Sequence, residues 1–205
     1  MTPDLPSFSE VARFHGHRCP GLALGYRAVE AGLAALGSAR APDEELVCII
    51  ENDACGVDAV QYVAGCTLGK GNLVFRDYGK HAYTFLSRRT GEAVRVAQRP
   101  DFSAGRLDPR TSELRPKVTA GTATPEEEEE FRRRAEEVIG TILRLPAGDM
   151  FTIRRVTEPL PPMARIFRSV ACARCGEVVS EARARVRDGQ VVCIPCCRAG
   201  QEQAR

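Results

Sequence analysis

The chain has 205 residues, of which 43% are hydrophobic and 27% are charged, and its formal net charge is +2. This composition supports one ordinary domain with a small appendage and argues against wholesale disorder. The charge is too close to neutral to indicate a dedicated nucleic-acid-binding protein. The N-terminus is too polar for a secretory signal peptide, and no apolar run reaches the roughly 18 residues of a membrane span. We therefore expect a cytoplasmic protein without a membrane partner, whose nine cysteines serve metal or redox chemistry rather than disulfides.

The first half of the chain predicts two helices and two strands. Residues 20–37 read as a helix, with proline in the first turn, apolar residues at helical spacing, and Gly37 as the stop. Residues 45–51 form a short continuous apolar run, which is typical of a buried strand. A short helix over residues 58–66 and another strand in residues 73–79 follow.

The second half predicts a hairpin, a loop, a long helix and a further strand. Residues 81–99 hold two strand-like runs joined around Thr90, and residues 101–124 are rich in Pro, Gly and Thr, which is typical of a loop. The sequence TPEE then provides a capping box for a helix over residues 124–145. With one more strand in residues 151–158, the pattern predicts an α+β fold in which helices flank a mixed β-sheet.

The C-terminal tail carries the clearest metal motif. Two C-x-x-C pairs are separated by 17 residues, the spacing of a four-thiolate zinc site. The predicted ligands are Cys172, Cys175, Cys193 and Cys196. We divide the chain into a main domain over residues 1–158, a linker over 159–165 and a zinc ribbon over 166–205, in which Zn²⁺ supplies much of the stability. The tail is basic, about +4 from residue 163 onward, and its arginines provide a weak indication of nucleic-acid binding.

A second cluster of candidate ligands lies in the N-terminal stretch FHGHRCPG. His15, His17 and Cys19 alternate, and in an extended segment their side chains point the same way. Cys19 and Cys55 each precede a predicted helix, where the helix dipole favours a thiolate. His15 taken alone reads more often as a capping or hydrogen-bonded polar residue. The predicted ligands of a second site, for Zn²⁺ or another transition metal, are therefore His17, Cys19 and Cys55.

Candidate proton-transfer residues are Asp58, Lys70 and Lys80, because an acid and a lysine beside a metal can act as proton donor and acceptor. The glycine-rich turn TLGKGN lacks the spacing of a phosphate-binding loop, so it does not indicate nucleotide binding.

The stretches FHGHRCPGLALGYR and ENDACGVDAVQYVAGCTLGKGNLVFRDYGKHAYTF, followed by a four-cysteine tail, resemble the E-subunit family of formylmethanofuran dehydrogenase. The resemblance covers roughly residues 7–157 and the tail. It implies an α+β main domain, often a homodimer, with a metal site at His17, Cys19 and Cys55. It also implies an accessory role beside an oxidoreductase, because the chain lacks molybdopterin-binding and ferredoxin motifs.

Three hypotheses stay open from the sequence. The first is a metal-binding protein whose main-domain site is catalytic, where three protein ligands favour catalysis and four favour a structural role. The second is an accessory or regulatory module that binds a partner protein or nucleic acid through the ribbon. The third is a thiol redox protein that cycles Cys19 and Cys55, with both pKa values lowered by the helix N-termini.

Overall fold

The computed structural model describes residues 5–202 and divides the chain into two compact units, Met1–Met163 and Ala164–Arg205. The segment after the last strand of the first unit is tied to that unit, because the Arg88 guanidinium donates to the carbonyl of Pro161 at 2.7 Å. Each unit has its own secondary structure, and each is described by itself. Within residues 5–202, no helix is long and apolar enough to cross a membrane.

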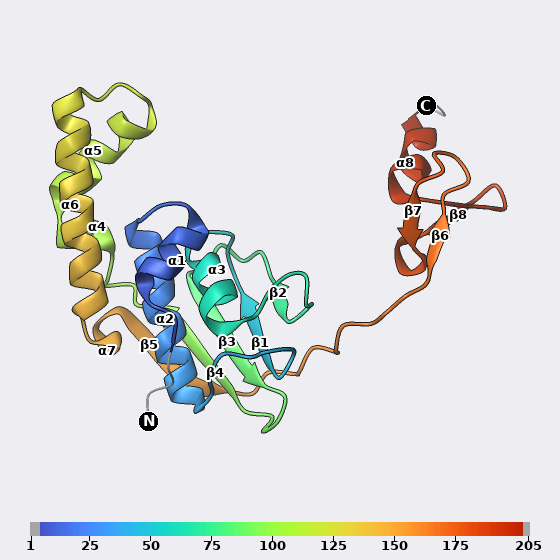
Figure 1. Ribbon diagram of the computed structural model, residues 1–205, viewed down its shortest axis with the longest axis horizontal. Coiled ribbons are helices and arrows are strands. Elements are labelled where there is room, and N and C mark those ends of the chain that lie inside the picture. The colour runs from blue at the N-terminus through green and yellow to red at the C-terminus, as the bar shows by residue number, and fades with distance from the viewer. Residues whose placement is uncertain (1–4, 203–205) are drawn as a thin grey trace. The chain divides into compact units, whose positions relative to one another are not determined.

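A five-stranded mixed sheet forms the centre of the first unit, in the order β2-β1-β3-β4-β5 (Figure 1). β1 pairs with β2 in parallel, and the remaining neighbours are antiparallel. The predicted α+β fold with a mixed sheet is therefore confirmed. The strands are β1 (Leu46–Ile50), β2 (Leu73–Phe75), β3 (Ala82–Ser87), β4 (Ala93–Gln98) and β5 (Phe151–Val156).

One face of the sheet is covered by α2 (Pro20–Leu36), which packs on β3 and β4 and also against α6 (Pro125–Arg144). The apolar positions that predicted α2 are buried, and Gly37 ends the helix in the left-handed conformation at φ 65°. Such a φ is accessible to glycine at little cost. α6 begins at the predicted capping box, where the Thr124 hydroxyl accepts from the amide of Glu127.

The opposite face of the sheet has a smaller apolar cluster, which includes Val47, Ile49 and Leu86. The same face carries an ion pair between buried Glu51 on the chain after β1 and Arg95 of β4, with 2.8 Å between Arg95 Nη2 and Glu51 Oε2. A buried carboxylate requires such a partner, because burial without one disfavours its charge.

The prediction that residues 101–124 form a loop is wrong. They hold α4 (Ala104–Leu107) and α5 (Pro109–Thr119), and the Asp108 side chain caps α5 by accepting from the amides of Arg110 and Thr111. Asp-Pro is a start signal for a helix, but the surrounding Pro, Gly and Thr residues concealed it. Ion pairs hold α5 on α6, among them Arg110–Glu130. Further short elements are α7 (Ala147–Met150), α1 (Phe8–His15), α3 (Gly56–Ala59) and the π-helix η1 (Val60–Ala64).

The second unit has two small antiparallel ladders. β8 and β9 are joined by a tight turn at Asp188 and Gly189, both with positive φ. The elements are β6 (Ser169–Ala171), β7 (Val178–Ser180), η2 (Glu181–Arg183), β8 (Arg185–Arg187), β9 (Gln190–Val192) and α8 (Ile194–Glu202).

Candidate metal centre

Four candidate ligand atoms meet at the start of α2. The side chains of His15, His17, Cys19 and Cys55 each offer one nitrogen or sulfur, and these atoms all lie within 4.8 Å of one another. The predicted trio is therefore brought together, and His15 joins it. Two thiolates and two imidazoles form the donor set of a tetrahedral zinc site, so the residues present fit a Zn²⁺ ion or a similar transition metal.

The local backbone differs from the extended segment that the sequence predicts. His15 is the last residue of α1, and Gly16 ends that helix in the left-handed conformation at φ 93°. This reversal stacks the two imidazole rings with centroids 4.4 Å apart. Cys19 then caps α2, where its sulfur accepts from the amide of Leu22 at 3.4 Å. Convergence therefore results from a helix end and a helix start rather than from strand alternation.

Cys55 reaches the cluster because α3 approaches α2 at backbone distance. A Cβ on Gly25 would lie 2.2 Å from the Cα of Gly56, so only glycine fits at that crossing. One turn earlier in α2, a Cβ on Gly21 would lie 3.6 Å from the Cβ of Cys55. The glycines thus set the separation between the helix start that carries Cys19 and the one that carries Cys55.

His15 is oriented by a carboxylate. Its Nδ1 lies 2.7 Å from Oδ2 of Asp58, and Gln61 donates to the other carboxylate oxygen at 3.1 Å. The opposite ring nitrogen, Nε2, is buried and has no hydrogen-bond partner among the described residues. A carboxylate on one nitrogen and an unsatisfied second nitrogen are the arrangement of a metal-ligating histidine.

The Cys19 thiol is protonated at neutral pH when no cation is present. Burial raises the pKa of the Cys19 thiol to about 11, and the nearby Cys55 contributes in the same direction. The start of α2 does lower the pKa of Cys19, through the hydrogen bond from the Leu22 amide, but the net pKa of Cys19 is raised. Desolvation outweighs the hydrogen bond from the Leu22 amide. A bound cation would reverse this balance, because a coordinating thiol loses its proton.

A cavity of about 430 Å³ opens beside the cluster. His15, Cys55 and Asp58 lie in its wall together with apolar residues, among them Leu68 and Phe75. This volume falls within the usual range of small-molecule sites. The cluster therefore has access to a space that a small molecule can enter.

The three predicted proton-transfer residues are separated in the structure. Asp58 lies at the cluster, whereas Lys70 donates to the main-chain carbonyls of residues 41–43 and fixes that loop. The Lys80 ammonium lies 5.9 Å from the centroid of the Tyr78 ring. Neither lysine lines the cavity beside the cluster, so the structure brings only Asp58 to the candidate metal centre.

The tail cysteines form a second cluster. The sulfurs of Cys172, Cys175, Cys193 and Cys196 lie within 4.8 Å of one another. Hydrogen bonds from main-chain amides, those of Cys175 and Cys193 foremost, lower the pKa of Cys172 to about 6. Neighbouring thiols, Cys193 first, raise the pKa of Cys196 to about 12. A tetrahedral zinc ion would bind all four of these sulfurs as thiolates.

Sequence reasoning left His15 out of the predicted ligands. One imidazole at a helix end gives no signal by itself, and the carboxylate that orients it lies 43 positions away in the chain. The usable signal is the pair of histidines two positions apart combined with an acid in the first turn of the helix that follows Cys55.

Comparisons with known proteins identify families for both parts of the chain. A family model described as "FmdE, Molybdenum formylmethanofuran dehydrogenase operon" matches residues 14–152, and one for the "Prokaryotic dksA/traR C4-type zinc finger" matches residues 165–199. A "Probable S-adenosyl-L-methionine-binding protein" from Archaeoglobus fulgidus is 31% identical over 188 residues, which are 89% of this chain and 50% of that protein. The chain thus spans about half the length of that curated relative.

A solved structure shares the fold. The tungsten formylmethanofuran dehydrogenase FmdE-like protein from Syntrophus aciditrophicus aligns with a TM-score of 0.57 at 23% identity, over 95% of this chain and 94% of that one. The FmdE model covers well over half of the sequence, and its range includes the four candidate ligands of the main domain. The chain therefore belongs to the FmdE family and carries a C4-type zinc finger at its C-terminus.

Proposed function

We propose that this protein is a metal-binding protein with two separate sites, a structural zinc site in the tail and a functional site for Zn²⁺ or another transition metal in the main domain. The buried, unpaired Nε2 of His15 within the His/Cys cluster is the observation that carries the second site. The position of His15 in the wall of a cavity supports a catalytic role for this metal site rather than a purely structural one. All nine cysteines are free, which supports a reducing compartment such as the cytoplasm.

The four candidate ligands differ in burial and in the hydrogen bonds that fix their side chains. His15 is fixed by Asp58, and Cys19 and Cys55 are half-buried at helix starts. His17 is exposed and has no hydrogen-bond partner among the described residues. We therefore assign His17 as the exchangeable ligand, whose departure opens a coordination position for substrate. This assignment reconciles four protein ligands with catalysis, which requires an open position.

A bound metal would supply Lewis acidity at this position. Asp58 accepts the proton on His15 Nδ1, which fixes the tautomer that leaves Nε2 free to coordinate. The same carboxylate lies in the cavity wall, where it can accept a proton from a molecule bound there.

The test is cobalt loading of the full chain and of single alanine variants, followed through the visible absorption of tetrahedral cobalt–thiolate complexes. Cys19→Ala and Cys55→Ala should abolish the main-domain spectrum. His17→Ala should retain a bound ion with altered absorption and bind an added small ligand such as imidazole. Loss of the ion in His17→Ala, as complete as in the cysteine variants, would indicate a closed structural site instead.

An accessory role is the second candidate function. Membership of a family named for a dehydrogenase operon supports an oxidoreductase partner, and the basic tail supports nucleic acid. A homodimer, which the family resemblance implies, stays a prediction. The support for nucleic acid is reduced, because acidic side chains pair with arginines of the tail, as in Arg168–Glu181 and Arg174–Asp188. Binding to nucleic acid that stays flat between low and moderate salt would exclude a phosphate-directed interaction.

The name of the Archaeoglobus relative raises S-adenosyl-L-methionine as a ligand. Asp53 and Asp58 in the cavity beside the cluster would suit its positive charges, and the cavity is large enough for part of it. Titration of the metal-loaded protein with S-adenosyl-L-methionine, compared with the Asp53→Asn variant, tests this ligand. The third hypothesis, thiol redox cycling, has less support, because the raised pKa of Cys19 disfavours a reactive thiolate.

A further inference from the structure

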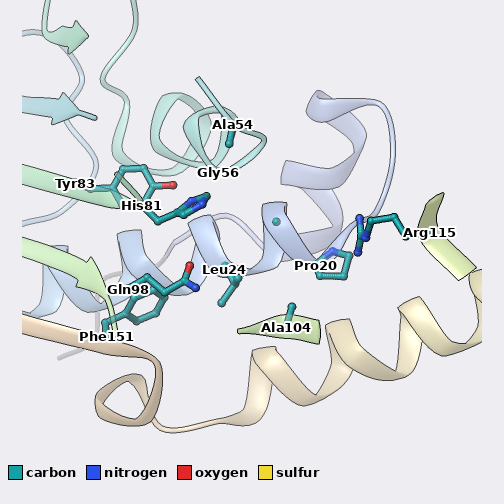
Figure 2. A pocket seen from close by; sticks show the side chains of 11 residues that line it. Pro20, Leu24, Ala54, Gly56, His81, Tyr83, Gln98, Ala104, Arg115 and Phe151 are labelled. Atoms are coloured by element: carbon teal, nitrogen blue, oxygen red, sulfur yellow. The ribbon is translucent and has the colours of Figure 1, made fainter. Parts of the chain in front are cut away.

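A second cavity lies on the other side of the loop that carries Cys55. It has a volume of about 200 Å³ and is bounded by the first turn of α2, the ends of β3 and β4, and residues of α4 and α5 (Figure 2). This is the space of about six or seven water molecules at roughly 30 Å³ each. A small organic molecule fits, whereas a nucleotide-sized cofactor does not.

The charged groups in the wall of this cavity have one sign. Arg115 of α5 lines it, no aspartate or glutamate does, and Arg115 has no acidic partner among the described residues. The guanidinium carbon lies 5.7 Å from the centroid of the Phe131 ring, which holds the side chain by a cation–π contact. An arginine that is held in place but not neutralised is suited to an anion, and its planar fork matches a carboxylate.

The remaining wall carries both polar and apolar groups. Figure 2 shows His81, the Tyr83 hydroxyl and the Gln98 amide on the strand side. Phe151 lies beside Gln98, its register partner in the neighbouring strand, and Leu24 of α2 completes the apolar part of the wall. Burial raises the pKa of Tyr83, so its hydroxyl stays protonated and can donate a hydrogen bond. Such a lining fits an apolar body with one anionic group and one further polar group.

The cavity is adjacent to the candidate metal centre. Gly21 lines it, and a Cβ on Gly21 would lie 3.9 Å from the sulfur of Cys55. Ala54 and Gly56, the neighbours of Cys55 in the chain, line it as well. The cavity therefore adjoins the main chain around Cys55, but no side chain of the four-ligand cluster lines it.

We propose that this cavity binds a small carboxylate with an apolar body, held by Arg115. Binding of the carboxylate is independent of the metal function proposed for the main domain. Leu24 and Phe151 contact the body, and Tyr83 and Gln98 orient it by hydrogen bonds.

The experiment is an NMR titration of the metal-loaded full chain with benzoate, with the neutral benzamide and inorganic phosphate as comparison probes. Benzoate should shift the amide signals of Gly21 and Gly56 and bind at least tenfold more tightly than benzamide. Arg115→Gln should weaken benzoate tenfold to a hundredfold, as expected for loss of a charged hydrogen bond. Arg133→Gln, an exposed arginine of α6 outside the cavity, is the matched control and should bind benzoate like the wild type.

Metal content is measured in the same samples, so that a failure of the carboxylate site is distinguished from a failure of the metal site. Equal binding of benzoate and benzamide, or of wild type and Arg115→Gln, overturns the carboxylate site whether or not the main-domain metal is present. Phosphate that binds more tightly than benzoate and depends on Arg115 also overturns it, in favour of a phosphate site. Arg115-dependent benzoate binding supports the carboxylate site, with or without a main-domain metal.

Discussion

The contact between Gly25 and Gly56 gives the sharpest prediction for the candidate metal centre. In Gly25→Ala, the new Cβ would lie 2.2, 2.7 and 2.8 Å from three main-chain atoms of Gly56. The shortest distance is about 1.2 Å below the 3.4 Å at which ordinary contact begins. Because main-chain atoms cannot rotate away as a side chain can, α2 and α3 must separate by about that amount.

We expect two consequences of this separation. Overpacking at the upper end of its usual range costs about 3 kcal/mol, and the better helix propensity of alanine returns about 1 kcal/mol, so the unfolding free energy should fall by about 2 kcal/mol. A shift of about 1 Å also exceeds the few tenths of an ångström that metal–ligand distances tolerate. The main-domain site should therefore lose at least about tenfold in metal affinity.

The assay combines urea unfolding of the main unit, followed by circular dichroism, with metal titration of the same samples. Gly32→Ala is the matched control, because its Cβ would meet the Phe85 ring at 2.3 Å, away from the ligands. It should be destabilised but keep its metal affinity. Gly148→Ala, with open space at the Cβ, should change stability by less than about 0.5 kcal/mol. Wild-type stability and metal affinity in Gly25→Ala would show that the contact between Gly25 and Gly56 does not set the position of Cys55.

Three further predictions follow from named contacts. Asp58→Asn should keep the fold but weaken main-domain metal binding by about tenfold to a hundredfold, because His15 loses its orienting carboxylate; unchanged affinity by metal titration would contradict this role. Cys193→Ser should remove the tail metal and unfold only the second unit, which proteolysis at the tail measures; loss of the main-domain metal as well would contradict two separate sites. Hydrogen bonds from Arg95 hold the pKa of Glu51 below its ordinary value of 4.5. The stabilisation by the Glu51–Arg95 pair is complete above about pH 4.5 and is lost as the pH falls through the lower folded-state pKa of Glu51. Glu51→Gln should therefore lower the unfolding free energy by about 2–3 kcal/mol at neutral pH and by progressively less in acid. A difference in unfolding free energy that stays constant with pH, measured by urea unfolding, would contradict this role of the ion pair.

Sequence reasoning predicted the elements whose signals are local. α2 and α6 have their periodicity, caps and stops within their own residues, and β1 is a short apolar run between polar flanks. α5 was missed because its stability comes from ion pairs with α6 and from Leu114 rather than from a clear apolar stripe. Its cap at Asp108 was the one local signal.

The candidate site was predicted in part for the same reason. The cysteine spacing of the tail is a local motif. Two of the three predicted main-domain ligands, His17 and Cys19, lie two positions apart in the chain. Lys70 and Lys80 were chosen by proximity in sequence, and the fold directs them to main-chain carbonyls and to Tyr78. Arg115 could not be predicted as part of any site, because only the packing of α5 brings it to the start of α2.

We propose that one chain holds two metal ions at independent sites. Elemental analysis of the full chain, purified without oxygen, tests this most directly when wild type is compared with the Cys19→Ala/Cys55→Ala double variant. We expect about two metal ions per chain in the wild type and about one in the double variant, whose remaining ion is the zinc of the tail. About one ion per chain in both proteins would contradict a metal centre in the main domain.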